Sequence, residues 1–247
     1  MKYISTLTGT FLLAVIFAVS CSQDTMSGLE SSNQSNLAGN PSSNSTDLHM
    51  EATYDIKIEN LTPATVAGAS QPLSPPVIAS HSPDFRIFHI GAYASDELRN
   101  VAEDAINGPL VSLLQNSDDV YNMTTGSGPI LPGSNDSFSL KAKRGYHKIS
   151  FVSMLVNTND AFTGMDKVTL PEKGSKTYYL RSYDAGTEKN TELTSDIPGP
   201  CCGNVQVRVP THERIQFHSG ILGIGDLDPA IYDWDDPVAK VTITRMN

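Results

Sequence analysis

Acidic side chains are concentrated in the stretch SYDAGTEKNTE at residues 182–192, where Asp184, Glu188 and Glu192 stand four residues apart. Four-residue spacing normally places side chains on one face of a helix, but Gly, Asn and Thr are poor helix formers and like charges at this spacing repel. The stretch is therefore predicted to be a loop. A loop that gathers carboxylates either lies open to water or holds a positive charge between them.

A second segment, NTND, ends in Asp160 and follows an apolar run. If the strands before Asp160 and Asp184 are neighbours, both loops open at one end of a sheet, where Asp160, Asp184 and Glu188 converge. Calcium takes about six to eight oxygen ligands from carboxylates, carbonyls and water, whereas zinc and copper prefer the His and Cys ligands that are missing nearby. The three carboxylates predict a calcium site; the alternative is that the acids are simply solvated. Asn190 and Glu192 are candidates for outer-shell groups, but for these two the solvated alternative is favoured.

A further acidic loop, GDLDPAIYDWDDP at residues 225–237, places five aspartates around Trp234, the only tryptophan of the chain. A tryptophan at the rim of a domain can stack on a sugar ring, which makes a carbohydrate-binding domain the alternative function. The same side chain can instead close the end of a sandwich by packing. A second cation in this loop is disfavoured, because Pro229 and Pro237 interrupt the spacing of an EF-hand.

Motifs of common enzymes are incomplete in this chain. HERIQ at residues 212–216 lacks the second histidine of a zinc protease motif, and Gly126-Ser127-Gly128 is one residue too tight for a nucleophile elbow. The sequence therefore predicts a non-catalytic protein. A hydrolase that uses two of the loop carboxylates is the remaining enzymatic alternative.

The elements that must position these loops are mostly short strands. TYDIKIEN at residues 53–60 and VAKVTITR at residues 238–245 alternate apolar and polar side chains, which is typical of half-buried strands. Pro-Gly and Lys-Gly pairs separate other strand-like runs. These runs lie at residues 85–90, 137–142, 148–156, 177–183, 205–209 and 214–218.

One stretch, SDELRNVAEDA, has a helical pattern instead. Ser95 is a candidate N-cap, and Leu98, Val101 and Ala105 follow at helical spacing, with Gly108 and Pro109 as the stop and LVSLLQN as an extension by a turn or two. Many short strands and one helix predict an all-β fold, an antiparallel Greek-key β-sandwich with one short helical insertion.

The N-terminal fifty residues fall outside this pattern. Residues 1–20 begin with a lysine, continue as an apolar run and end in a small residue, which is the layout of a secretory signal peptide. Cys21 follows AVS, as in a bacterial lipobox, and predicts a lipid anchor that holds the protein on a membrane of the cell envelope. The alternative is an ordinary signal peptide with an incidental cysteine. Residues 21–50 are rich in Ser, Asn and Gly and are predicted to be a disordered tether before a domain at 51–247.

The net charge restricts the classes of partner, and the positions of the cysteines restrict their bonding. Removal of residues 1–20 leaves 16 Lys and Arg against 27 Asp and Glu, so the net charge is 16 − 27 = −11. Such a chain repels phosphate backbones, so we expect no nucleic-acid partner. Cys201 and Cys202 are adjacent; a vicinal disulfide and two free thiols both remain open, and a zinc site is improbable without a spaced pair.

Several motifs in this order resemble the spondin domain family, found at the N-terminal part of F-spondin and alone in bacterial secreted proteins. They are LSPPVIASHS, IFHIGAYASDELRNVAEDA, MLVNTNDAF, YDAGTE and YDWDDPVAKVTITR, and they extend over residues 53–245. The resemblance implies a β-sandwich similar to the calcium-binding domains of membrane-targeted proteins. It also implies adhesion or matrix attachment, with an extracellular protein or glycan as partner.

The family pattern places calcium ligands in two loops, Ser-Pro-Asp-Trp and Asp-Ala-Gly-Thr-Asp. Carried over by motif, the first aspartate falls on Asp160 and the second loop on Asp184 and Glu188. This chain has glutamate at Glu188 where the family has aspartate, which lengthens the side chain. It has Ala161-Phe162 where the family has tryptophan, which changes the surroundings of the first loop.

Overall fold

The computed structural model describes residues 51–64 and 70–247, which belong to one compact unit. The predicted signal peptide, Cys21 and the predicted tether to residue 50 lie outside these residues. Within the two described ranges, no helix is long and apolar enough to cross a membrane.

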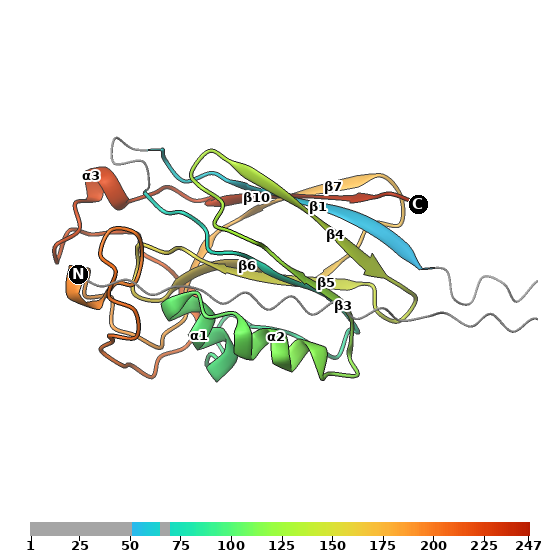
Figure 1. Cartoon of the computed structure of the whole chain (residues 1–247), viewed down its shortest axis with the longest axis horizontal. Coiled ribbons are helices and arrows are strands. Elements are labelled where there is room, and N and C mark those ends of the chain that lie inside the picture. The colour runs from blue at the N-terminus through green and yellow to red at the C-terminus, as the bar shows by residue number, and fades with distance from the viewer. Residues whose placement is uncertain (1–50, 65–69) are drawn as a thin grey trace, which may run out of the picture. The chain divides into compact units, whose positions relative to one another are not determined.

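Two antiparallel sheets pack face to face, which confirms the predicted β-sandwich (Figure 1). The smaller sheet has the strand order β4-β1-β10-β7, and the larger has the order β3-β2-β5-β6-β8-β9. The strands are β1 (Ala52–Asn60), β2 (Val77–His81), β3 (Val120–Thr125), β4 (Asn135–Ala142), β5 (Lys148–Met154), β6 (Ala161–Thr169), β7 (Ser175–Leu180), β8 (Ser182–Asp184), β9 (Gln216–Phe217) and β10 (Ala239–Arg245). The helices are α1 (Asp96–Asp104), α2 (Gly108–Gln115), α3 (Pro229–Tyr232) and the 3-10 turn η2 (Thr194–Asp196).

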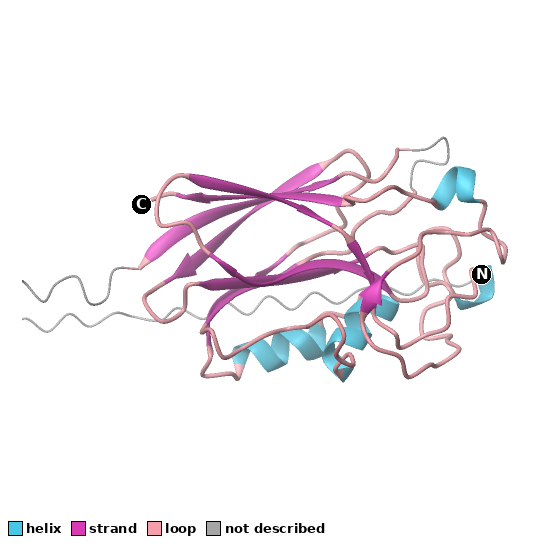
Figure 2. Ribbon diagram, turned by 180° about the vertical axis from the view of Figure 1, so that it is seen from behind, coloured by secondary structure: helices cyan, strands magenta, loops and turns pink. Residues whose placement is uncertain are grey.

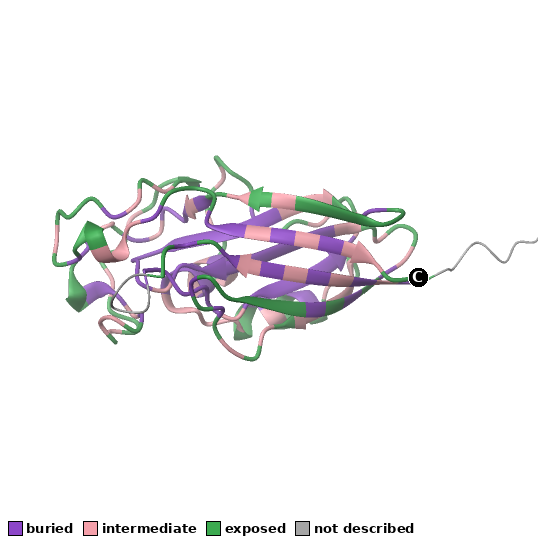
Figure 3. Ribbon diagram, turned by 90° about the horizontal axis from the view of Figure 1, so that it is seen from above, coloured by how far each residue is buried: buried purple, intermediate pink, exposed green. Residues whose placement is uncertain are grey.

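The main core lies between the two sheets. Along β1 and β10 buried and half-buried residues alternate, as the sequence pattern predicts, and Figure 3 shows the resulting stripes across the smaller sheet. Ile56 and Ile58 of β1 pair with Ile243 and Val241 of β10, so the fully buried side chains of the two strands lie side by side. Each such side chain contributes roughly 1.5–3 kcal/mol by leaving water.

Helices α1 and α2 cover the outer face of the larger sheet (Figure 2). The helix predicted after Ser95 is confirmed, and the Ser95 hydroxyl accepts a hydrogen bond from the Leu98 N–H at 3.2 Å. The insertion is larger than predicted, because the following LVSLLQN forms a separate helix, α2, with Leu110 and Leu114 buried. A second apolar cluster fills the space between these helices and the sheet.

Two predicted strands are wrong. Residues 85–90 are irregular; Ile87 and Phe88 are buried because the segment packs over the larger sheet, not because it joins one. Residues 205–209 are also irregular, with a left-handed backbone at Gln206 (φ 62°) and an exposed Val205. The run predicted as one strand at 177–183 is divided between β7 of the smaller sheet and β8 of the larger. The run at 214–218 contributes only the two residues of β9, and the strands β2, β3 and β6 were not predicted.

Gly164 of β6 provides a test of this packing. A Cβ atom at this position would collide with the carbonyl oxygen of Phe151 and lie 3.0 Å from the Phe88 ring. We expect Gly164→Ala to lower the free energy of unfolding by about 1–3 kcal/mol in urea titrations. Gly128→Ala is the matched control, because nothing lies within 4 Å of its Cβ position, and a loss of equal size in both variants would contradict the packing.

Candidate metal centre

The pairing of β6 with β8 brings two of the predicted ligands together. Ala161, the first residue of β6, lies opposite Asp184, the last residue of β8. Asp160 therefore precedes one strand at the point where Asp184 ends the other, and the Ala185 N–H donates a hydrogen bond to the Asp160 carbonyl at 3.2 Å. Both loops open at the same end of the sandwich.

The carboxylate of Asp160 is fully buried and only half satisfied. Its Oδ2 accepts hydrogen bonds from the N–H groups of Thr187 at 2.8 Å and Glu188 at 3.0 Å, and from the Thr187 hydroxyl at 3.3 Å. Its Oδ1 is buried and has no hydrogen-bond partner within residues 51–64 and 70–247. Burial, together with the nearby charge of Asp184, raises the pKa of Asp160 from 3.8 to about 7.

Asp184 is held by its own loop. Its Oδ1 accepts a hydrogen bond from the Gly186 N–H at 2.7 Å, and its Oδ2 accepts one from the Asn190 side chain at 2.8 Å. Gly186 has φ +70°, and a Cβ there would lie 2.6 Å from the carbonyl oxygen of Glu213. Only glycine fits this turn, which wraps the 184–190 loop over Asp160.

Glu188 is buried and weakly held. Its Oε1 accepts two long hydrogen bonds, from the Asn159 side chain at 3.4 Å and from the Val209 N–H at 3.3 Å. Burial raises the pKa of Glu188 to about 8; the two hydrogen bonds oppose this shift, and the charges of Glu103 and Asp160 add to it.

The three predicted ligands do not form a closed cluster. No three acidic, histidine or cysteine side chains of the described part of the chain come close enough together to make a metal-binding group. The pair that the fold brings together is Asp160 and Asp184. A cation at the free Oδ1 of Asp160 would take its remaining ligands from carbonyl, amide or water oxygens, which calcium accepts readily.

The two candidates for outer-shell groups have different roles. Asn190 links Asp184 to His218, because its carbonyl oxygen lies 3.3 Å from the His218 Nε2. The Gly220 N–H donates to the Nδ1 of His218, so the Nε2 carries the proton that bonds to Asn190. Glu192 does not reach the centre; its carboxylate instead accepts hydrogen bonds from two backbone N–H groups of the 220–225 loop.

Trp234 is not a binding platform. Its side chain is 8% exposed and packs into the main core, and its indole N–H donates a hydrogen bond to the Ser182 hydroxyl at 3.1 Å. The carbohydrate-binding alternative assumed an exposed Trp234, and this burial contradicts that assumption. The side chain closes the end of the sandwich instead.

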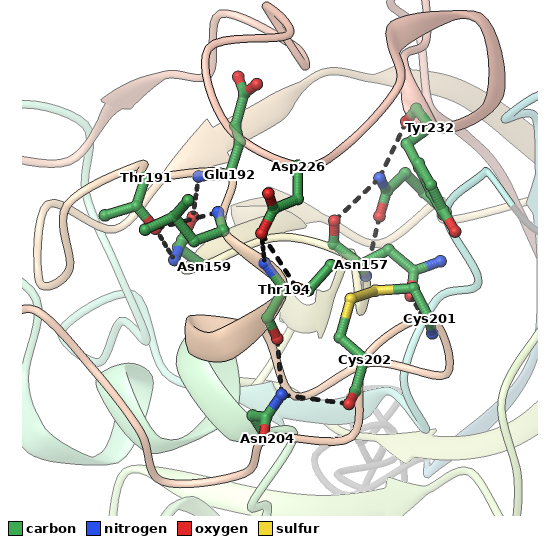
Figure 4. The surroundings of a disulfide bond; sticks show 12 residues. Asn157, Asn159, Thr191, Glu192, Thr194, Cys201, Cys202, Asn204, Asp226 and Tyr232 are labelled. Carbon is green, nitrogen blue, oxygen red and sulfur yellow. Dashed lines mark hydrogen bonds between the residues drawn. A yellow bond between two sulfur atoms is a disulfide. The ribbon is translucent and has the colours of Figure 1, made fainter.

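The adjacent cysteines form a disulfide beside this end of the fold (Figure 4). The Cys201 N–H donates a hydrogen bond to the Asn157 side chain at 3.2 Å, and Asn204 donates to the carbonyl oxygens of Thr194 and Cys202. Gly199 lies against the carbonyl of Val156, where a Cβ atom would collide. The disulfide loop is thereby fixed to the segment that leads to Asp160.

One buried ion pair was missed by the sequence reasoning. Glu103 of α1 is buried, and its carboxylate lies 2.6 Å from one guanidinium nitrogen of Arg208, while the other terminal nitrogen of Arg208 pairs with Asp104 at 2.7 Å. Burial raises the pKa of Glu103. The two partners are far apart in the sequence, so no local spacing could have revealed the pair.

Comparison with known proteins identifies the family of this chain. The Spondin_N family model matches residues 65–220. The chain belongs to the Spondin_N family. The matched residues of this Spondin_N chain include Asp160, Asp184 and Glu188, whereas Trp234 lies beyond them.

Two curated relatives share the Spondin_N region. The chain is 25% identical over 180 residues to Spondin-2 of Homo sapiens, an alignment that covers 68% of this chain and 51% of that protein. The chain is also 25% identical over 180 residues to Spondin-2 of Rattus norvegicus, and this alignment covers 52% of that protein. The chain thus spans about half the length of the curated relatives it matches.

The raised pKa values predict how stability depends on pH without calcium. Asp160 and Glu188 hold protons more tightly when folded, with pKa values of about 7 and about 8, than at their ordinary values of 3.8 and 4.5. Their contribution to stability is present below about pH 4 and is lost as the pH rises through 7 to 8, by at most about 1.4 kcal/mol per pH unit for each proton.

Urea unfolding in EDTA at pH 5 and pH 8 measures this effect. We expect Asp160→Asn to lose less stability than the wild type over the same interval, because the amide does not ionise. Identical pH dependence in the two proteins would show that Asp160 is already ionised at the lower pH.

Proposed function

We propose that this protein is a calcium-binding adhesion module of the Spondin_N family, tethered by lipid at Cys21 to the bacterial cell envelope. The family assignment supports an extracellular, non-catalytic module that contacts matrix or surface molecules. The lipobox-like AVS before Cys21 supports the anchor. Acyl chains on this cysteine add about 0.8 kcal/mol of membrane affinity for each buried CH₂, so several chains would hold the protein firmly.

The observation that carries the calcium proposal is the free Oδ1 of Asp160. A buried carboxylate oxygen without a donor costs free energy, and a second carboxylate beside it raises that cost unless a cation lies between them. Asp160 and Asp184 would hold the ion, and Glu188 would join them because its two hydrogen bonds are long. When bound, calcium would neutralise the acids and stiffen the loops that face a partner.

Calcium should therefore stabilise the folded protein. A ligand that binds only the native state adds RT ln(1 + [L]/Kd), about 2.7 kcal/mol at a hundredfold excess over Kd, so the Tm should rise with calcium and fall with EDTA. Asp160→Asn keeps the acceptor for the Thr187 and Glu188 N–H groups and removes the charge. It should abolish the calcium-dependent rise while raising the Tm in EDTA, and Asp184→Asn should act in the same direction.

Asp118→Asn is the control for this experiment, because Asp118 is exposed at the other end of the sandwich and should change neither value. If the acids are simply solvated, millimolar calcium at constant ionic strength should not change the Tm of any of these proteins. That result would refute the calcium site.

The lipid anchor has a separate test. Cys21→Ser should abolish incorporation of labelled fatty acid and release the protein into soluble fractions, because the acyl chains supply its strong membrane affinity. The double variant Cys201→Ser/Cys202→Ser keeps Cys21 and should be labelled like the wild type. Equal labelling of the Cys21→Ser variant would contradict lipidation at this site.

A further inference from the structure

Cations without an acidic partner gather at the end of the sandwich opposite the carboxylate loops. Residues 51–247 contain 16 Lys and Arg, of which seven have a carboxylate within 4.0 Å, so 16 − 7 = 9 have none among the described residues. Seven of these nine belong to the strand ends and turns at this end. They are Lys143, Arg144, Lys148, Lys167, Lys173, Lys176 and Arg245.

The antiparallel topology explains why these residues meet. Strands β1, β5 and β7 begin at this end, and β4, β6 and β10 end there, so the turns at 143–147 and 170–174 lie side by side with the C-terminus. Figure 1 shows β1 starting where β10 finishes, next to the C-terminal label. We call this surface the basic end and define it by the seven cations named above.

The basic end is hollowed, and it also carries the acidic residues Glu51, Asp118 and Glu172, although none of the seven cations has a carboxylate of the described residues within 4.0 Å. One hollow of about 500 Å³ is lined by Lys143, Arg144, Glu172 and Arg245, and a second of about 430 Å³ shares Glu172 and Arg245. The Arg245 guanidinium donates to the backbone carbonyl of Glu172 at 2.8 Å. The Lys143 ammonium lies over the rings of two tyrosines, at 4.2 and 5.0 Å from their centroids. Guanidinium and ammonium groups arranged in this way suit phosphate oxygens.

We infer that the basic end docks on an anionic phospholipid surface. The chain enters the sandwich at this end, and 29 residues, from 22 to 50, separate Cys21 from Glu51. Such a segment reaches at most about 100 Å when extended, so a lipid at Cys21 and the basic end can contact one bilayer together. This inference rests on the proposed lipid anchor, because the anchor is what would bring a bilayer close to the basic end. Screening over about 10 Å at 0.1 M salt hides the acidic far end from that bilayer.

The test uses residues 22–247, a chain that keeps the segment before β1 but carries no acyl group. Its binding to vesicles of equal parts phosphatidylglycerol and phosphatidylcholine is compared with binding to phosphatidylcholine alone, by sedimentation in EDTA. We expect binding to the anionic vesicles only, and its loss when salt rises from about 0.1 M to about 0.5 M. Arg144→Glu/Lys173→Glu should weaken it at least about 20-fold, since each basic side chain contributes about fivefold.

The matched control is Lys57→Glu/Lys189→Glu, which reverses two exposed or half-exposed cations away from the basic end and should change binding by less than about threefold. Equal binding to both kinds of vesicle, or equal loss in the two double variants, would overturn the inference. Fatty-acid labelling of Cys21 and the calcium-dependent Tm are read separately. Absence of vesicle binding with those two results intact would refute the docking surface alone.

Discussion

The register between β6 and β8 forces two carboxylates into one buried loop end, and the other features of that end are arranged around this constraint. The 184–190 loop turns at Gly186 and covers Asp160, which gives one carboxylate oxygen two backbone N–H groups and leaves the other with none. Apolar side chains at this end would avoid the free-energy cost of burying a carboxylate oxygen that has no hydrogen-bond donor. Because this buried acid is only half satisfied, we propose a cation as its partner.

The same strand topology separates charge along the sandwich. Asp160, Asp184 and the aspartates of the 225–237 loop lie where β5 and β8 end, whereas seven of the nine unpaired cations lie where β1 begins. The net charge of −11 for residues 21–247 does not reveal this separation, because a total does not record where the charges lie. In the tethered module that we propose, the basic end would meet the membrane and the acidic end would present its loops to a partner.

The sequence predicts those elements whose apolar residues recur at regular spacing, and it misses the others. β1, β10 and α1 were predicted because their apolar residues recur at strand or helix spacing and a cap marks the helix start. β6 was missed because Ala161–Met165 is buried on both faces and Gly164 interrupts the run, so no alternation exists. The segment at 85–90 looks like a strand because Phe88 packs against Phe162, with ring centroids 5.0 Å apart. The apolar residues of this segment are explained by packing against the sheet and not by pairing with a strand.

The sequence predicted which residues form the candidate site, but it did not predict their hydrogen bonds and loop contacts. Asp160 follows the apolar run that forms β5, as predicted, but β5 and β8 are not neighbours. The unpredicted β6 lies between them, and its pairing with β8 brings Asp160 and Asp184 together. The orphaned Oδ1 and the support from His218 through Asn190 depend on loop contacts between distant segments, which spacing does not encode. Trp234 shows the converse, since its acidic neighbours suggest a rim position while its side chain is buried.

The measurement that tests the central claim most directly is the stoichiometry of calcium bound to the purified protein, determined by equilibrium dialysis with radioactive calcium beside an Asp160→Asn variant. Our account predicts saturable binding of one ion per chain in the wild type and none at this site in the variant. Absence of saturable binding in the wild type, or unchanged binding in the variant, would contradict it.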